Sequence, residues 1–211
     1  MALSRFNSIL LTVLSILVAL VSYRFLVLGL DDAFPDFKDH IALRNLAFIA
    51  HVSASPIALL VGALQFLPKT RAKNPKLHRW MGRIYGVSVL IGGISGLSLA
   101  LGAVGGPIAS AGFGLLAIFW LYTTAQAVRM AMAGKFKKHR EWMIRSFALT
   151  FAAVTLRLLL VGFIVAGFEY GPATVYIAWL CWVPNLVFAQ WWIKRTRNRS
   201  IATQGKLQGQ A

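Results

Sequence analysis

Two short segments of the chain combine histidine, arginine and tryptophan in nearly the same order. Residues 77–83 read LHRWMGR and residues 138–145 read KHREWMIR, with Glu141 as a single insertion. The chain has only four histidines, and two of them, His78 and His139, share this context. Imidazole is a common axial ligand of haem iron, and arginines can pair with propionates. The motifs therefore predict a haem b site held by His78 and His139, with Arg79 and Arg140 beside it.

Two further ionisable residues, His51 and Arg157, lie inside long apolar stretches. His51 is about eight residues, and Arg157 about thirteen residues, into its own stretch, so both lie in the half of the bilayer away from the motifs. A charge at such depth is costly unless it faces protein, water or an anion. We expect Arg157 to point into the bundle near His51. Its partner is then an anionic ligand or cofactor, or hydroxyl and carbonyl groups such as those of Ser53 and Ser55.

Two residues nearer the surface invite simpler expectations. Arg24 stands close to the end of the first apolar stretch, and an arginine there can extend its side chain towards the interface. We expect it to reach Asp31 and Asp32. His40 lies in the acidic connection that follows, and we expect it to be solvated.

The composition shows what must position these residues. Of 211 residues 58% are hydrophobic and 13% charged, whereas about a quarter are charged in a soluble domain. A helix of about 20 apolar residues crosses a bilayer, and each stretch is too long and too uniformly apolar for a barrel strand. The predicted fold is all-α, a polytopic bundle of six transmembrane helices within residues 1–199, followed by a polar, disordered tail (200–211). The spans are about 8–30, 43–66, 82–104, 111–133, 144–168 and 172–194. We expect the first span to be a retained helix and not a signal peptide.

The charges predict the orientation. The chain has 22 Lys and Arg against 6 Asp and Glu, and nearly all of the basic residues fall in alternate connections and at the two ends. Basic residues in short loops stay cytoplasmic. We therefore expect a bacterial inner (cytoplasmic) membrane protein with both termini in the cytoplasm, whose basic loops attract anionic lipid headgroups. Nucleic acid is excluded as a partner because too much of the chain is apolar; the oligomeric state is left open.

The two motifs also indicate an internal repeat. Each stands where the chain re-enters the membrane from the same side, so spans two–three and four–five are predicted to be parallel helix-hairpin repeats. Span three carries small residues at Ser88, Gly92 and Gly96, a spacing that allows close helix packing or admits a flat macrocycle. Pro184 predicts a mild kink in span six.

The motif residues, together with His51, residues 65–66 (QF) and the segment 146–157 (SFALTFAAVTLR), resemble the bacterial membrane-protein family known as domain of unknown function 2306. The likeness covers about residues 45–160. It implies a membrane protein and carries no activity. More loosely, six helices with a few histidines are similar to the transmembrane b-type cytochromes, a likeness that implies haem and a quinone or another redox partner.

Two classes of function follow. One is a haem b or quinone-linked transmembrane electron-transfer protein; if the chain is an enzyme, it is then a membrane oxidoreductase. The other is a transporter, or a protein that binds a lipid or an anionic small molecule without a redox cofactor, because helix N-termini preceded by basic residues attract anions. A third hypothesis is that the protein is an accessory subunit of a membrane complex. No zinc-spaced Cys/His cluster, P-loop or nucleophile–base pair is present in the sequence.

Overall fold

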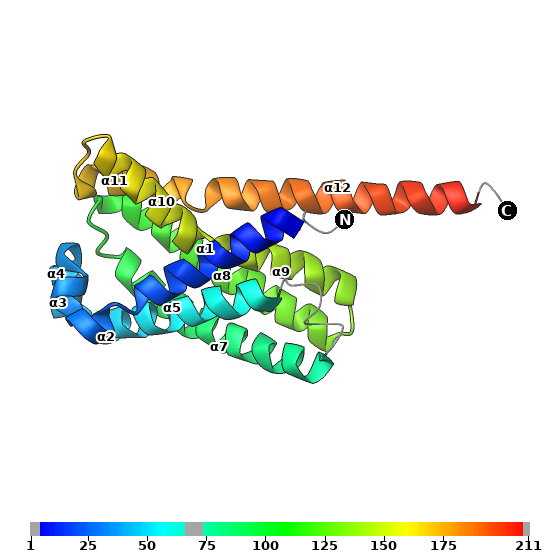
Figure 1. Cartoon of the computed structure of the whole chain (residues 1–211), viewed down its shortest axis with the longest axis horizontal. Coiled ribbons are helices and arrows are strands. Elements are labelled where there is room, and N and C mark those ends of the chain that lie inside the picture. Colours follow the sequence, from blue (N-terminus) through cyan, green and yellow to red (C-terminus); the bar gives the residue numbers. More distant parts are fainter. Residues whose placement is uncertain (1–4, 66–73, 209–211) are drawn as a thin grey trace.

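The computed structural model describes residues 5–65 and 74–208, with side chains described for 6–65 and 74–198. Every regular element in this part of the chain is a helix. Six helical segments are long and apolar enough to cross a membrane, which confirms the predicted all-α bundle of six spans (Figure 1). They are Phe6–Leu28, Asn45–Gln65, Pro75–Ala100, Gly106–Met132, Phe136–Val165 and Tyr170–Asn198.

The first span ends in a cap at one end of the bundle. Helix α1 (Arg5–Ser22) stops at a turn, and four short helices follow: α2 (Phe25–Leu28), α3 (Leu30–Ala33), η1 (Pro35–Phe37) and α4 (Lys38–Leu43). An aromatic cluster holds this cap on the bundle, in which Phe34 meets Phe48 edge-on with ring centroids 5.1 Å apart. The cap is therefore anchored by packing, although it lies in an acidic connection.

Helices α5 (Asn45–Gln65) and α7 (Pro75–Ala100) lie side by side because glycines remove the side chains between them. A Cβ added at Gly92 would lie 2.6 Å from Ser55 Oγ, and one at Gly96 would lie 3.0 Å from the His51 ring. Such close approach is what small residues at four-residue spacing permit. The packing interpretation of the Ser88–Gly92–Gly96 face is confirmed.

The last two spans are each broken near the middle. Helix α8 (Gly106–Met132) is continuous, but span five divides at Phe151 into α9 (Phe136–Thr150) and α10 (Ala152–Val165). Span six divides into α11 (Tyr170–Leu180) and α12 (Val183–Gln208), just before Pro184, which cannot donate a backbone hydrogen bond. The predicted kink is present as a short turn at Cys181 and Trp182, across which the Leu186 N–H still bonds to the Trp182 carbonyl at 2.9 Å.

One side chain joins the two breaks. The Asn185 amide N–H donates to the Cys181 carbonyl at 2.9 Å within its own span. It also lies 3.0 Å from Thr155 Oγ1 and 3.4 Å from the Ala148 carbonyl, both in span five. Backbone groups freed at mid-membrane need such partners, so Asn185 stabilises both interruptions at one level.

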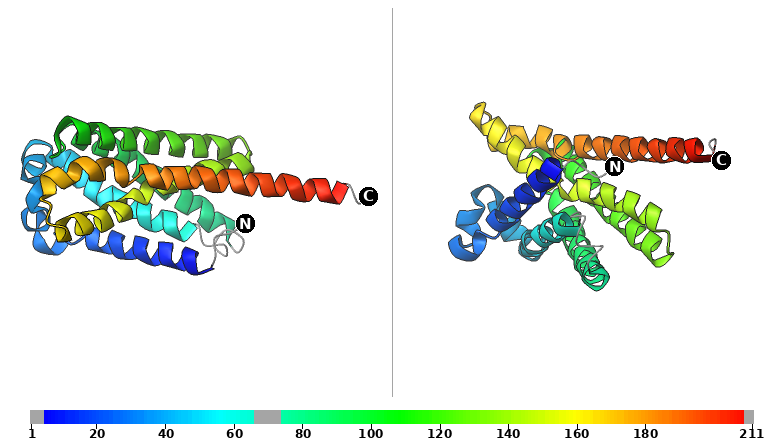
Figure 2. Two further views of the ribbon diagram at one scale, coloured as in Figure 1. Left: turned by 90° about the horizontal axis from the view of Figure 1, so that it is seen from above. Right: turned by 45° about the vertical axis from the view of Figure 1, so that its right-hand side comes forward.

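Several helices extend beyond the predicted spans. Helix α7 begins at Pro75 where we predicted 82, α9 begins at Phe136 where we predicted 144, and α12 continues to Gln208, past 194 and into the predicted disordered tail. Hydropathy marks the hydrocarbon layer, whereas a helix continues until a cap or a proline ends it. In two views α12 extends beyond the other helices (Figures 1 and 2).

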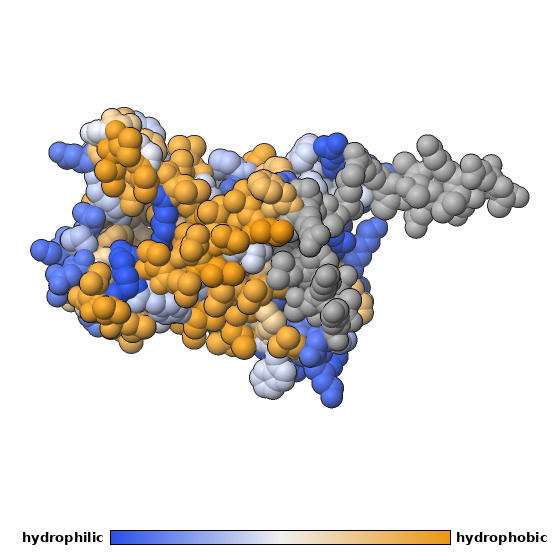
Figure 3. Space-filling model, viewed as in Figure 1, coloured by the Kyte–Doolittle hydropathy of each residue, from blue (hydrophilic) through white to orange (hydrophobic). Residues whose placement is uncertain are grey.

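Hydrophilic residues gather at both ends of the bundle, and an apolar band lies between them (Figure 3). The two ends differ in charge. The start of α7, the α8–α9 turn and the distal half of α12 lie at one end, which we call the basic end. The acidic end carries the cap and the α7–α8 and α10–α11 turns (Figure 1). Four residues of the predicted motif and of the first basic connection lie outside the described residues: Phe66, Lys69, Arg71 and Lys73.

Candidate functional site: a cationic cavity at the basic end

Local signals place His78 and His139 at equivalent positions in two helices. Asn74 caps α7 by accepting a hydrogen bond from the Leu77 N–H at 3.0 Å. Gly134, with a φ of 66°, ends α8 in a left-handed turn that lets α9 begin at once. The backbone N–H of each histidine then bonds to the carbonyl of the residue four positions before it, at 3.1 Å for His78 and 2.9 Å for His139.

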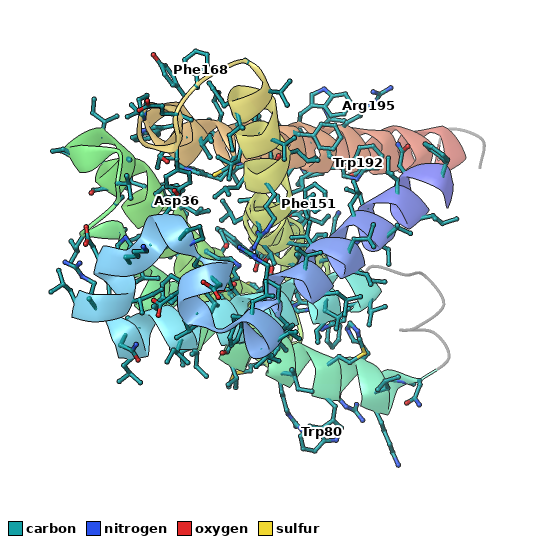
Figure 4. The ribbon with its side chains drawn as sticks, turned by 60° about the vertical axis from the view of Figure 1, so that its left-hand side comes forward. Asp36, Trp80, Phe151, Phe168, Trp192 and Arg195 are labelled. Atoms are coloured by element: carbon teal, nitrogen blue, oxygen red, sulfur yellow. The ribbon has the colours of Figure 1, made fainter. Side chains whose placement is uncertain are left out.

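The rest of each motif also repeats in three dimensions. The Arg83 guanidinium lies over the Trp80 ring, 5.1 Å from its centroid, and the Arg145 guanidinium lies over the Trp142 ring at 4.6 Å. Such cation–π pairs are common anchors at a membrane interface. Trp80 points outward from α7 (Figure 4). The sequence similarity between the motifs therefore reflects the same local structure.

Both histidines line one cavity of about 1790 Å³ at the basic end, bounded by α1, α5, α7, α8, α9 and α12. Most of its lining is apolar. Among the described lining residues, every charged side chain is an arginine: Arg79, Arg83, Arg129 and Arg140. Because this wall carries positive charge without carboxylates, the cavity is complementary to a molecule with an apolar body and an anionic group.

The imidazole of His139 is held in one tautomer. Its Nδ1 lies 2.8 Å from the carbonyl oxygen of Ala127 on α8. A carbonyl can only accept, so in the neutral imidazole Nδ1 carries the proton and Nε2 has the lone pair. A histidine oriented in this way is suited to accept a proton or to ligate a metal through Nε2.

A network of buried hydroxyl groups lies against the cavity. The Tyr85 hydroxyl is 2.7 Å from both Ser146 Oγ and Thr150 Oγ1. Trp120 Nε1 donates to Thr150 Oγ1 at 2.8 Å, and Thr124 Oγ1 lies 2.6 Å from Ser146 Oγ. This network connects α7, α8 and α9, and it fixes the helices that carry the two histidines.

Gln65 adds a polar group without a hydrogen-bond partner among the described residues. Its side chain lines the cavity, and its Nε2 is buried with no hydrogen-bond acceptor in the described part of the chain. A buried donor without an acceptor costs about 1–3 kcal/mol. An acceptor supplied by a bound molecule would remove this cost.

His51 and Arg157 lie apart from this cavity, nearer the acidic end. His51 Nδ1 donates to the Gly92 carbonyl at 2.8 Å. Arg157 donates to the Ala153 carbonyl and to Ser22 Oγ, both at 2.8 Å. The hydroxyl partner of Arg157 comes from α1, however, and not from Ser53 or Ser55, because α10 packs against α1.

Two expectations for the acidic end are wrong. Arg24 makes no ion pair with Asp31 or Asp32; it donates to the Ala33 carbonyl, and its guanidinium lies 4.5 Å from the centroid of the Phe34 ring. His40 is only 5% exposed, because it packs against Phe37 in the aromatic cluster of the cap. Burial, with the positive charge of Arg44, lowers the pKa of His40.

Comparison with known proteins identifies the family. The family described as predicted membrane protein DUF2306 matches residues 48–193. The chain belongs to this family. The match extends beyond the segment whose resemblance was visible in the sequence, and covers the spans that carry both motifs and both helix breaks. No curated protein matches the chain, and no solved structure does. The likeness to b-type cytochromes therefore has no support from these comparisons.

Three features of the site were not predicted from the sequence. They are the hydroxyl network around Tyr85, the buried amide of Gln65, and Asn185 at the junction of the breaks. Ser146 and Thr150 are four residues apart in an apolar stretch, which puts two hydroxyls on one helix face. That spacing could have indicated the network.

Proposed function

We propose that this member of the DUF2306 family is a bacterial inner-membrane protein that binds an anionic amphiphile in the cavity at its basic end. One observation carries the proposal: the described lining is mostly apolar, and its charged side chains are four arginines. It also contains two histidines and no carboxylate. The unsatisfied amide of Gln65 supports it. The volume exceeds the roughly 300–1,000 Å³ of small-molecule sites, so it has room for a lipid or a macrocycle.

The ligand is tested by thermal stabilisation of the detergent-purified protein with dioleoyl-phosphatidylglycerol, against dioleoyl-phosphatidylcholine. The anionic lipid should bind more tightly to the wild type. Removing two interfacial charges at about 1 kcal/mol each should weaken its binding about 30-fold in the Arg79→Gln/Arg140→Gln variant. The matched control is Lys194→Gln/Arg195→Gln on α12, outside the cavity lining. Equal loss in both double variants would refute a site at the cavity.

The orientation is part of the proposal: the basic end lies in the cytoplasm, because short basic loops are retained there. Cysteines introduced at Lys137 and at Asp36, on opposite ends, test it. Cys181 is the only native cysteine and is 0% exposed, so it contributes little background. In intact cells, an impermeant thiol reagent should label the cysteine at 36 and spare the one at 137; equal labelling would contradict the orientation.

Haem b is a second candidate for the same cavity, favoured by the histidines. His78 and His139 line one space from equivalent helix positions, and His139 keeps a lone pair on Nε2. Arg79 and Arg140 would neutralise the propionates. When bound, haem would supply one-electron chemistry, and a quinone or protein redox partner would exchange the electron. The chain's own contribution is to orient the imidazoles and to exclude water.

An absorption spectrum distinguishes the two ligands. Protein from haem-sufficient cells should show a Soret band and a sharpened α-band after dithionite if haem is bound, and His78→Ala and His139→Ala should each remove them. A colourless wild type that still binds phosphatidylglycerol would leave lipid as the ligand. Retention of the spectrum in both variants would move the iron ligands away from this site.

A further inference from the structure

The acidic half of the bundle contains two arginines whose hydrogen bonds all go to neutral groups. Arg157 donates to the Ala153 carbonyl and to Ser22 Oγ, and Ser22 itself donates to the Val18 carbonyl at 2.7 Å. Arg24 donates to the Ala33 carbonyl. A guanidinium has five N–H groups, so each arginine has donors left over after these bonds.

The two positive charges lie close together. The Arg157 guanidinium bonds to Ser22 Oγ at 2.8 Å, and Ser22, the last residue of α1, stands two residues before Arg24. His51 offers no compensation, because its Nδ1 donates to a backbone carbonyl. Asp31 and Asp32 are exposed on the cap, and in the described ranges no carboxylate lies at ion-pair distance from either arginine.

Two like charges without a counter-ion are unfavourable inside a membrane. Their repulsion grows as the dielectric constant falls, and intramembrane arginines normally pair with an anion or with water. Both side chains are only partly buried, so some of their surface can be reached from outside the protein. Hydrophilic patches interrupt the apolar face towards the end that carries the cap (Figure 3).

We propose that Arg24 and Arg157 together bind the oxyanion headgroup of a membrane amphiphile where α10 meets the end of α1, at a place separate from the cavity at the basic end. Carboxylates and phosphates accept several N–H bonds from arginine and are bound by the planar guanidinium with defined geometry. Ser22 positions Arg157 and does not itself reach the anion. The proposal does not depend on the ligand of the cavity, because it rests on different residues at the other end of the bundle.

A double-mutant cycle tests this site. Arg24→Met, Arg157→Met and the double variant are compared with the wild type by reversible unfolding, in phosphatidylcholine nanodiscs with and without phosphatidylglycerol, and again with added oleate. The cavity is unchanged in all four proteins, so its own lipid binding cancels in the cycle. Direct binding of the two anionic probes is measured in parallel.

We expect the interaction between the two arginines to be unfavourable in phosphatidylcholine and favourable when the anionic amphiphile is present. Each single variant should bind the probe about tenfold more weakly, as expected for loss of one hydrogen bond to a charged group. A response to phosphatidylglycerol alone identifies a phospholipid headgroup, and a response to oleate alone a carboxylate. A coupling that is the same with and without both probes would overturn the proposal.

Discussion

Replacing Tyr85 by Phe and Thr150 by Val removes one hydroxyl each from the network against the cavity, and the structure predicts unequal costs. In Tyr85→Phe every remaining polar group keeps a partner: Ser146 retains Thr124 Oγ1, and Thr150 retains Trp120 Nε1 and the Ser146 carbonyl. The loss is then that of ordinary membrane-buried hydrogen bonds, about 1 kcal/mol.

Thr150→Val leaves donors behind. Trp120 is 7% exposed, and its indole N–H loses the Thr150 hydroxyl as acceptor, while the Tyr85 hydroxyl loses one of its partners. An orphaned buried donor costs about 1–3 kcal/mol in addition to the lost hydrogen bond. We therefore expect Thr150→Val to lower the free energy of unfolding by about 2–4 kcal/mol.

The assay is unfolding by sodium dodecyl sulfate in mixed micelles, followed by tryptophan fluorescence. Tyr122→Phe on α8 is the matched control, since Tyr122 is 51% exposed, and its effect should be close to zero. A Tyr85→Phe variant that is destabilised as much as Thr150→Val would refute the ranking, because it would mean that Trp120 does not depend on Thr150.

Two further predictions concern packing and pH. Gly62→Ala should destabilise the bundle by about 1–3 kcal/mol, since the new Cβ would lie 2.8 Å from the Phe147 ring, whereas Gly86→Ala, with no atom within 4 Å, should be nearly neutral in the same unfolding assay. The lowered pKa of His40, caused by burial and by Arg44, means that below its ordinary value of about 6.5 the unfolded chain binds more protons than the folded one. Stability should therefore fall as the pH drops from about 6.5 towards 5, and His40→Gln should remove that part of the slope; an unchanged slope would mean that His40 is protonated when folded.

Hydropathy and charge were sufficient to predict the six spans, because the bilayer makes both signals strong. They could not predict the breaks at Phe151 and at Cys181, since broken and continuous helices have the same composition. Only the break in span six was indicated by the sequence, through Pro184. The breaks depend on Asn185, whose partners are far away in the sequence.

The candidate site was predicted in part. The matching motifs indicated that His78 and His139 occupy equivalent places, and both do line one cavity. The partners of Arg157 and the burial of His40 were not predictable, because each depends on a segment, α1 or the aromatic cap, whose packing no local pattern encodes. A polar connection predicts a solvated loop, whereas the phenylalanines in this one form a small core.

The most direct test of the central proposal is equilibrium binding of phosphatidylglycerol to a variant whose cavity is narrowed beside Gln65. Gly82 lines the cavity, and a Cβ there would have Gln65 Oε1 nearby at 3.9 Å, so Gly82→Leu has room for its Cβ and extends its side chain into that space. Gly162→Leu on α10 is the control, because Gly162 also has open space and does not line the cavity. The proposal predicts that Gly82→Leu loses most of the binding while Gly162→Leu retains it. Undiminished binding in a folded Gly82→Leu protein would show that the cavity is not the site.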